Sequence, residues 1–167
     1  IIVVDSGDID FGSQDIEKFA RERLSSFPGI TGKSLIEQVS GLTEEYCSQE
    51  FIQNANRKKD GFFVLIYDLG AKRNIVKTLM GLGCRVKIVG PGTKFADIKT
   101  LGASGVVFSN GPGDPEPCTE AIKFARLAIK DRMPCLGICL GHQIISLALG
   151  GKTVKMSVGH HGANHPV

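Results

Sequence analysis

The sequence predicts an α/β protein with a doubly wound, mostly parallel sheet. Between residues 61 and 167, apolar strand-like runs alternate with helical patterns about every dozen residues. The run "FFVLIYD" stays apolar until its end, as expected for a strand that is buried on both faces of a parallel sheet. Two glycine-rich turns, "SNGPGDP" and "GICLGHQ", follow later strands, and the crossovers between the parallel strands are expected to be right-handed.

The expected elements follow one another in a regular order. The helix expected over 71–83 has Ile75, Leu79 and Leu82 on one face, and glycines mark where it stops. The other expected elements are strands over 1–4, 62–68, 84–90, 105–110 and 133–138, and helices over 14–24, 33–43, 93–102, 120–130 and 141–151.

The chain divides into two parts by pattern. Residues 1–60 carry weak signals and are interpreted as the end of an N-terminal domain plus a polar linker. Residues 61–167 are interpreted as the α/β domain. In parallel sheets, ligands bind at the carboxyl ends of the strands, so both glycine-rich turns are expected at one rim of the sheet.

Composition excludes several classes of function. The net charge is only +3, and no Lys/Arg block is interleaved with aromatic residues, so nucleic-acid binding has no support. The apolar runs are too short to cross a bilayer, and the start lacks the basic segment of a signal peptide. The five cysteines are irregularly spaced without a C-x-x-C pair, which indicates reduced thiols and a cytoplasmic protein.

Cys139 lies in "GICLG", a nucleophile elbow with cysteine in place of serine. Gly137 and Gly141 flank it at the spacing that a sharp strand-to-helix turn needs. The N-terminus of the following helix favours a thiolate, and the N–H of Leu140 points to where an oxyanion would form. Cys139 is therefore predicted to be the nucleophile, whereas a free cysteine in a core element is usually a packing residue. Packing is the interpretation for Cys47, Cys84, Cys118 and Cys135.

The "SNGPGDP" loop has two interpretations, a simple tight turn and a ligand-binding loop. It lacks the lysine and the glycine spacing of a phosphate-binding loop. Its glycines would let backbone N–H groups approach a ligand closely. The N–H of Gly111 is therefore the expected second oxyanion donor, and one such donor is typically worth about 3 kcal/mol of transition-state stabilisation.

A thiolate nucleophile usually needs a histidine as base. His142 lies in the first turn of the helix after the elbow. From there its geometry makes it a poor base for Cys139, so it is interpreted as structural. The other histidines, in "GHHGANHPV", lack ligand partners at metal-binding spacing, so no metal site is expected. None of them follows a strand that would bring it to the rim. A protein ending at Val167 is thus expected to show at most trace activity at Cys139, because the thiol would lack its base.

"GICLGHQ" resembles the signature of the class I (triad) glutamine amidotransferases, which have a flavodoxin-like α/β fold. Together with "YDLGAKRNI", "FSNGPGDPEPC" and "GGKTVKMSVGHHGANHPV", the resemblance narrows to the small, glutaminase subunits of carbamoyl phosphate synthetases. It covers residues 62–167 strongly and the first sixty residues weakly. The "GHQ" after the elbow is shared with the glutaminases of anthranilate and aminodeoxychorismate synthases.

The resemblance implies that Cys139 attacks the side-chain amide of glutamine to give a thioester and ammonia. Gly111 and Leu140 would supply the oxyanion-hole N–H groups and bind glutamine with Gly113 and Gln143. The catalytic histidine and its orienting glutamate would lie downstream of "NHPV". The resemblance therefore implies that residues 61–167 are a class I glutamine amidotransferase domain that lacks its C-terminal part. A large synthetase subunit would combine the ammonia with bicarbonate, using ATP and Mg²⁺, into carbamoyl phosphate for pyrimidine and arginine synthesis. The small subunit itself would need no cofactor.

Two alternatives stay open at the level of sequence. One is another cysteine hydrolase, redox protein or glutaminase subunit on the same scaffold. The other is a non-catalytic module that only docks on a synthetase partner.

Overall fold

A computed structural model describes residues 16–41 and 61–156 of the chain. It divides into two units, Ile1–Thr31 and Gly32–Val167, each of which is described by itself. The strand expected over 1–4 lies outside the described residues.

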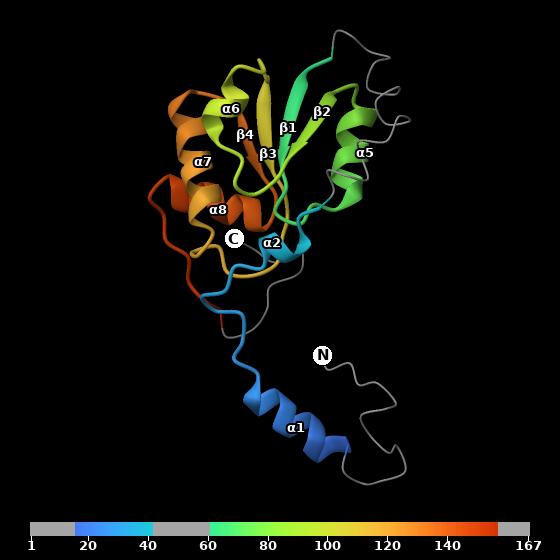
Figure 1. Cartoon of the computed structure of the whole chain (residues 1–167), viewed down its shortest axis with the longest axis vertical. Coiled ribbons are helices and arrows are strands. Elements are labelled where there is room, and N and C mark those ends of the chain that lie inside the picture. The colour runs from blue at the N-terminus through green and yellow to red at the C-terminus, as the bar shows by residue number, and fades with distance from the viewer. Residues whose placement is uncertain (1–15, 42–60, 157–167) are drawn as a thin grey trace. The chain divides into compact units, whose positions relative to one another are not determined.

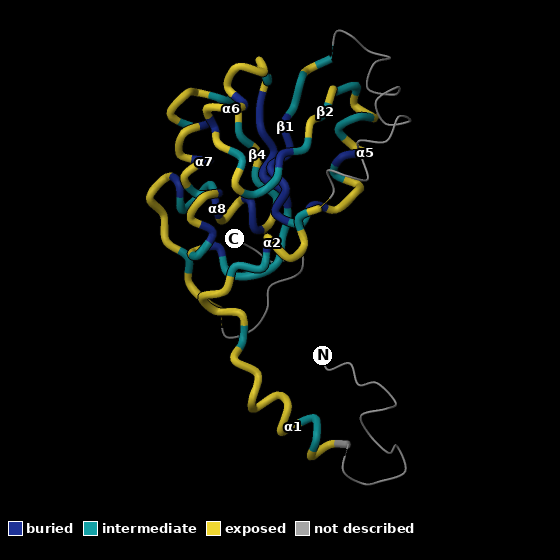
Figure 2. The backbone as a smooth tube through the Cα atoms, in the orientation of Figure 1, coloured by how far each residue is buried: buried dark blue, intermediate teal, exposed yellow. Residues whose placement is uncertain are grey.

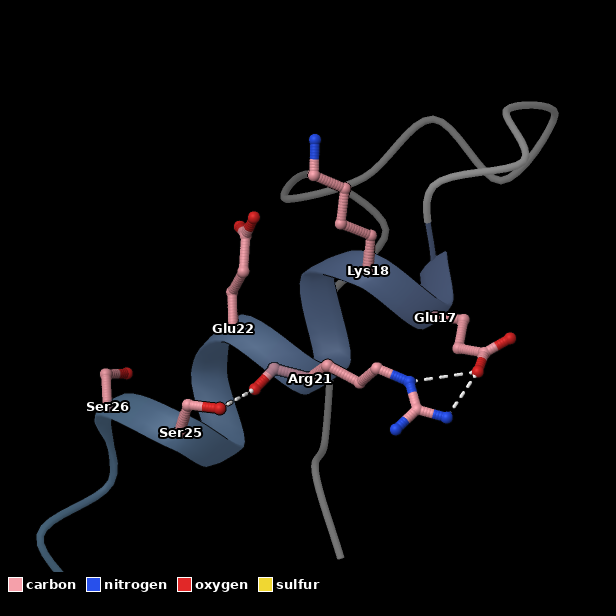
Figure 3. A pocket seen from close by; sticks show the side chains of 6 residues that line it. All are labelled: Glu17, Lys18, Arg21, Glu22, Ser25 and Ser26. Carbon is pink, nitrogen blue, oxygen red and sulfur yellow. Dashed lines mark hydrogen bonds and ion pairs between the residues drawn. The ribbon is translucent and has the colours of Figure 1, made fainter.

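The first unit contains α1, Ile16–Ser26, where a helix was expected over 14–24. Of its residues whose exposure is described, none is buried. Its polar side chains pair within the helix: Arg21 binds Glu17 at 2.6 Å, and the Ser25 hydroxyl donates to the carbonyl of Arg21 (Figure 3). A shallow hollow along this helix is lined by α1 residues alone, so it has one wall and does not enclose a ligand.

The second unit is built on a four-stranded sheet in the order β2-β1-β3-β4. Its strands are parallel, as the sequence predicts. Tyr67 pairs with both Val89 and Phe108, and Phe108 pairs with Gly137, so the carboxyl ends of all four strands meet at one rim. The strands are β1 Phe63–Tyr67, β2 Arg85–Val89, β3 Gly105–Phe108 and β4 Cys135–Gly137.

Helices cover both faces of this sheet, which makes it doubly wound (Figure 1). The helices α6, α7 and α8 lie on one face, and α5 lies on the other. None of the helices in the described ranges has the length and apolar character that a bilayer crossing requires. Their bounds are α2 Ile36–Val39, α5 Arg73–Gly81, α6 Phe95–Lys99, α7 Thr119–Lys130 and α8 Leu140–Ala148.

Successive residues of a strand face opposite sides of the sheet, so β1 and β3 each contribute to two separate core clusters. Leu65 and Tyr67 of β1 face the helices α6 to α8, whereas Ile66 faces α5. The first cluster is the larger because three helices pack there, and it also contains Ile36 of α2. Figure 2 shows buried residues concentrated in β1 and β3, the two central strands. The loops after these two strands lie at the rim, together with the turn that follows β4.

One expectation about α5 is wrong. Val76, not Leu82, is the buried residue of this helix, and the Leu82 side chain is 74% exposed. The helix ends at Gly81, so Leu82 is the C-cap and leaves the face that Ile75 and Leu79 share. The helical spacing therefore predicts the contact face correctly only as far as the helix continues.

The hydroxyl of Tyr67 has no hydrogen-bond partner in the described structure, although its ring is fully buried. Burial is the main cause that raises the pKa of Tyr67 to about 12. Replacing Tyr67 with phenylalanine should therefore raise the free energy of unfolding by about 1 kcal/mol, because it removes an unpaired buried group. Urea denaturation would measure the change, and a loss of stability would show that the hydroxyl is paired.

Candidate active site

Cys139 occupies a strained turn between β4 and α8. Its backbone has φ 54° and ψ −111°, a conformation that side-chain-bearing residues rarely adopt, and its side chain is exposed. Such strain costs about 1–3 kcal/mol and persists only where the surroundings enforce it. Because only Ile138 and Cys139 separate Gly137 from Leu140, the turn is as sharp as the elbow motif requires.

The two flanking glycines are required by space. A Cβ atom on Gly137 would lie 2.6 Å from the Cα of His142, and one on Gly141 would lie 2.2 Å from the carbonyl oxygen of Phe108. Backbone atoms cannot move aside as a flexible side chain can. The glycines therefore let α8 start directly against the ends of β3 and β4, which forces Cys139 outward.

The loop after β3 meets the elbow. A Cβ on Gly111 would lie 2.0 Å from the carbonyl oxygen of Leu69 and 2.9 Å from Cδ2 of Leu140. Among the described residues, the N–H groups of Gly111 and Leu140 have no hydrogen-bond acceptor. The structure thus brings together the two residues predicted to form the oxyanion hole and leaves both donors available. Their role in binding an oxyanion stays a prediction.

Gly113 and Gln143, the other predicted glutamine contacts, have different surroundings. Gly113 has φ 96° and forms an isolated antiparallel bridge with Ser34, and a Cβ there would lie 2.9 Å from the Lys33 carbonyl oxygen. Gln143 is exposed in the first turn of α8, and its N–H donates to the Cys139 carbonyl at 3.2 Å. Gln143 therefore lies one helical turn from the thiol, whereas Gly113 packs against the chain that precedes α2.

Asp114 fastens this preceding segment to the loop after β3. Its carboxylate accepts the N–H of Gly32 at 2.8 Å and that of Glu116 at 3.0 Å. These two backbone hydrogen bonds, in that order of effect, lower the pKa of Asp114 below its ordinary value of 3.8. The N–H of Asp114 also donates to the Lys33 carbonyl at 3.0 Å.

Acid should weaken this attachment. Because the pKa of Asp114 is lower in the folded state, the charged carboxylate stabilises the fold above its unfolded pKa, and this contribution is lost as pH falls through the folded pKa. We expect Asp114→Asn to lower the melting temperature more at pH 7 than at pH 2, because protonation of the carboxylate in acid removes the charge that the two N–H groups stabilise. Thermal unfolding at the two pH values measures this, and an equal difference at both would contradict it.

The remaining cysteines and the histidine of the described structure show no catalytic arrangement. Burial raises the pKa of the Cys118 thiol and of the Cys135 thiol, which suits packing residues. Cys84 is partly buried, and Cys47 lies outside the described residues. His142 is exposed, and the Cys139 thiol makes no hydrogen bond to any residue that the structure describes. The other three histidines lie outside the described residues.

An apolar hollow of about 390 Å³ lies at the opposite end of the sheet. Its walls include Phe62, Ser104 and Pro134, which precede or start β1, β3 and β4. It is therefore remote from the rim that carries Cys139. We place the candidate site at the rim because the exposed Cys139 thiol, the backbone strain and two N–H groups without an acceptor among the described residues coincide there.

Sequence reasoning missed the polar residues that hold the rim together. Asp68 and Ser109 directly follow the buried strands β1 and β3 and are themselves buried. The Asp68 carboxylate accepts the N–H groups of Gly70, Ala71 and Gly41. The available signal was a polar residue at the end of an apolar run, in "YD" and "FSN".

The chain that carries this elbow, at the rim and beside the glycine loop, belongs to the class-I glutamine amidotransferases. The model of that family, described as glutamine amidotransferase class-I, matches residues 65–167. A crystal structure from Thermoplasma acidophilum, whose protein is described as a putative GMP synthase subunit, is similar to this chain. The TM-score is 0.53, and the identity is 27% over 61% of this chain and 52% of that chain.

Curated relatives carry a narrower name, carbamoyl phosphate synthase small chain. The chain is 44% identical to that of Vibrio cholerae over 97% of its own length and 45% of the relative's. It is 46% identical to that of Neisseria meningitidis, over 91% and 41%, and 40% identical to that of Salmonella typhimurium, over 97% and 44%. The chain thus spans less than half the length of these relatives.

A zinc-finger family model also matches residues 30–63, but the residues do not fit a zinc site. This stretch contains one cysteine, Cys47, and no histidine, whereas structural zinc sites use four cysteine and histidine ligands. In the described parts of the chain, no group of three or more His, Cys, Asp or Glu residues could hold a metal ion.

The strain at Cys139 can be measured by comparing two variants that both lack the thiol. Cys139→Gly should be about 1 kcal/mol more stable than Cys139→Ala, because glycine adopts positive φ without steric cost and alanine does not. Chemical denaturation of the two variants gives the difference. An alanine variant as stable as the glycine variant would mean that the elbow is unstrained.

Proposed function

We propose that this chain is the glutaminase part of a carbamoyl phosphate synthase small chain. The observation that carries the proposal is Cys139, which lies strained and exposed between two obligatory glycines. Near it, the N–H of Gly111 has no acceptor among the described residues. Membership of the class-I glutamine amidotransferases supports glutamine as the substrate, and the relatives' shared name supports the synthase.

The reaction is acyl transfer through a thioester. The Cys139 sulfur attacks the side-chain amide carbon of glutamine, and the carbonyl oxygen becomes an oxyanion facing the N–H groups of Gly111 and Leu140. The intermediate collapses, the C–N bond breaks and ammonia leaves with the proton that the thiol gave up. Water then attacks the thioester carbon, releases glutamate and returns the proton to the sulfur.

The proton must be carried by a base, which the resemblance places downstream of "NHPV" as a histidine oriented by a glutamate. Gly113 and Gln143 hold glutamine in the same proposal. The protein is cytoplasmic and needs no cofactor of its own. Its partner is a large synthetase subunit, which uses ATP and Mg²⁺ to convert the ammonia and bicarbonate into carbamoyl phosphate.

The experiment is reconstitution of the full-length protein with the large subunit of the same organism. Glutamine, bicarbonate and ATP should give carbamoyl phosphate, and glutamine should give none without the small chain. Glutamine-dependent amination of chorismate instead would assign the protein to an anthranilate- or aminodeoxychorismate-type synthase. If glutamine is not consumed in either assay, the glutaminase proposal is wrong.

A further inference from the structure

Ser109 is a fully buried polar residue placed directly after β3, two positions before Gly111. Its hydroxyl accepts the N–H of Leu69 at 2.9 Å and donates to the carbonyl of Asn110 at 2.8 Å. Both the donor and an acceptor of the hydroxyl are therefore used, and a satisfied buried group of this kind rigidifies its surroundings. The Ser109 side chain thus ties the end of β1 to the loop that carries Gly111.

The backbone of Ser109 makes a second connection, to the elbow. Its carbonyl accepts the N–H of Gly141 at 3.1 Å, and its own N–H donates to the Tyr67 carbonyl at 3.2 Å. Gly141 directly follows Leu140 in the first turn of α8. Ser109 therefore makes a hydrogen bond next to each of the two predicted oxyanion donors. One is to Leu69, against which Gly111 packs, and the other is to Gly141, which directly follows Leu140.

We infer that Ser109 is a positioning residue that sets the separation between the N–H groups of Gly111 and Leu140. The inference rests on the proposed acyl-transfer function. Oxyanion donors must lie about 2.7–3.1 Å from the developing charge, and a misplacement of about 1 Å can reduce the rate about 100-fold. Ser109 does not touch the substrate in this role. It acts through the two loops that it joins.

Asn110 supports the same turn from its other side. Its Oδ1 accepts the N–H of Lys72 at 3.0 Å, and its Nδ2 donates to the carbonyl of Gly70 at 3.0 Å. The turn after β1 is thus held at Leu69 by Ser109 and at Gly70 and Lys72 by Asn110. This second attachment supplies a variant that loosens the same turn without leaving a buried group unpaired.

The test compares two reagents on Cys139 of the full chain. The ester p-nitrophenyl acetate acylates the thiol: a C–S bond forms, the ester C–O bond breaks, p-nitrophenolate leaves and the thiol proton goes to solvent. This reaction passes through an oxyanion. Iodoacetamide alkylates the same thiol with loss of iodide and forms no oxyanion. Subtracting the rates of a Cys139→Ala protein removes the contribution of the other cysteines.

Ser109→Ala should lower the ratio of acylation rate to alkylation rate at least about 10-fold, with alkylation within about twofold of wild type. Ser104→Ala is the matched control, because the Ser104 hydroxyl accepts the N–H of Phe63 at the opposite end of the same two strands. Its ratio should not change. If the ratio falls equally in Ser109→Ala and Ser104→Ala, the effect is a general loosening of the fold, and the inference is overturned.

If Ser109→Ala does not fold, Asn110→Ala takes its place, and its ratio should also fall. An unchanged ratio in the folded variant would overturn the inference. Glutamine hydrolysis by the wild-type protein reports on the proposed function separately. If the wild-type protein does not hydrolyse glutamine but Ser109→Ala still lowers the ratio, the proposed function is refuted and the positioning role of Ser109 is supported.

Discussion

Glutamine hydrolysis should fall by at least about 1,000-fold when Cys139 is replaced by serine, because the variant loses its thiolate nucleophile. Under the proposed function, the complex with the large subunit should still synthesise carbamoyl phosphate from added ammonia, because free ammonia replaces the product of glutamine hydrolysis. Both rates can be measured on one preparation of the complex.

Cys135→Ser is the matched control for this substitution. Cys135 lies four residues earlier in β4, and its thiol donates to the carbonyl of Met133 at 3.2 Å, a bond that serine can keep. Turnover close to wild type is expected. If both variants lose glutamine hydrolysis alike, the loss reflects damage to the fold and not removal of the nucleophile. If Cys139→Ser keeps its activity, the protein is not a cysteine amidotransferase.

Gly141→Ala should lower the free energy of unfolding by about 3 kcal/mol or more and abolish activity. Its Cβ would lie 2.2 Å from the Phe108 carbonyl oxygen and 2.6 Å from the carbonyl carbon, and neither atom can move without shifting β3. The hydrogen bond from Gly141 to the Ser109 carbonyl would be lost with this shift. Denaturant unfolding of the variant measures the effect.

Gly81→Ala is the control for Gly141→Ala, because Gly81 also lies in a helix but has open space around the position of a Cβ atom. Gly81 ends α5, and beyond its chain neighbours and the backbone of its own helix no described residue has an atom within 4 Å of a Cβ built there. Alanine is the better helix former by up to about 1 kcal/mol, so this variant should be as stable as wild type or slightly more so. A Gly141→Ala protein of unchanged stability would contradict the packing described at the elbow.

The order of elements and the position of the rim could be predicted from the sequence. The strand expected over 84–90, for example, is observed as Arg85–Val89. Charged and apolar residues alternate there between two glycines, and this pattern leaves few alternatives to a strand. The elbow was predictable for the same reason. Its glycines are a local sequence signature. The turn is so sharp that a Cβ atom on either glycine would clash with neighbouring backbone atoms.

The connections across the rim could not be predicted, because their partners are distant in the sequence. Ser109 binds Leu69, forty residues away, and Asp114 binds Gly32, eighty-two residues away. No periodicity reports such pairs. Likewise, the burial of Ile36 among the residues of the first core cluster depends on how the segment before α2 packs. Local patterns predict elements, and tertiary packing decides which polar residues support the site.

The most direct test of Cys139 as the nucleophile is to trap the intermediate. The full-length protein is mixed with glutamine, quenched in acid within the first turnover, digested and examined by mass spectrometry. We predict a γ-glutamyl adduct on the peptide that contains Cys139, and no adduct in the Cys139→Ser protein. Glutamine hydrolysis with the adduct on another cysteine, or with no covalent adduct at any time, would contradict the role assigned to this elbow.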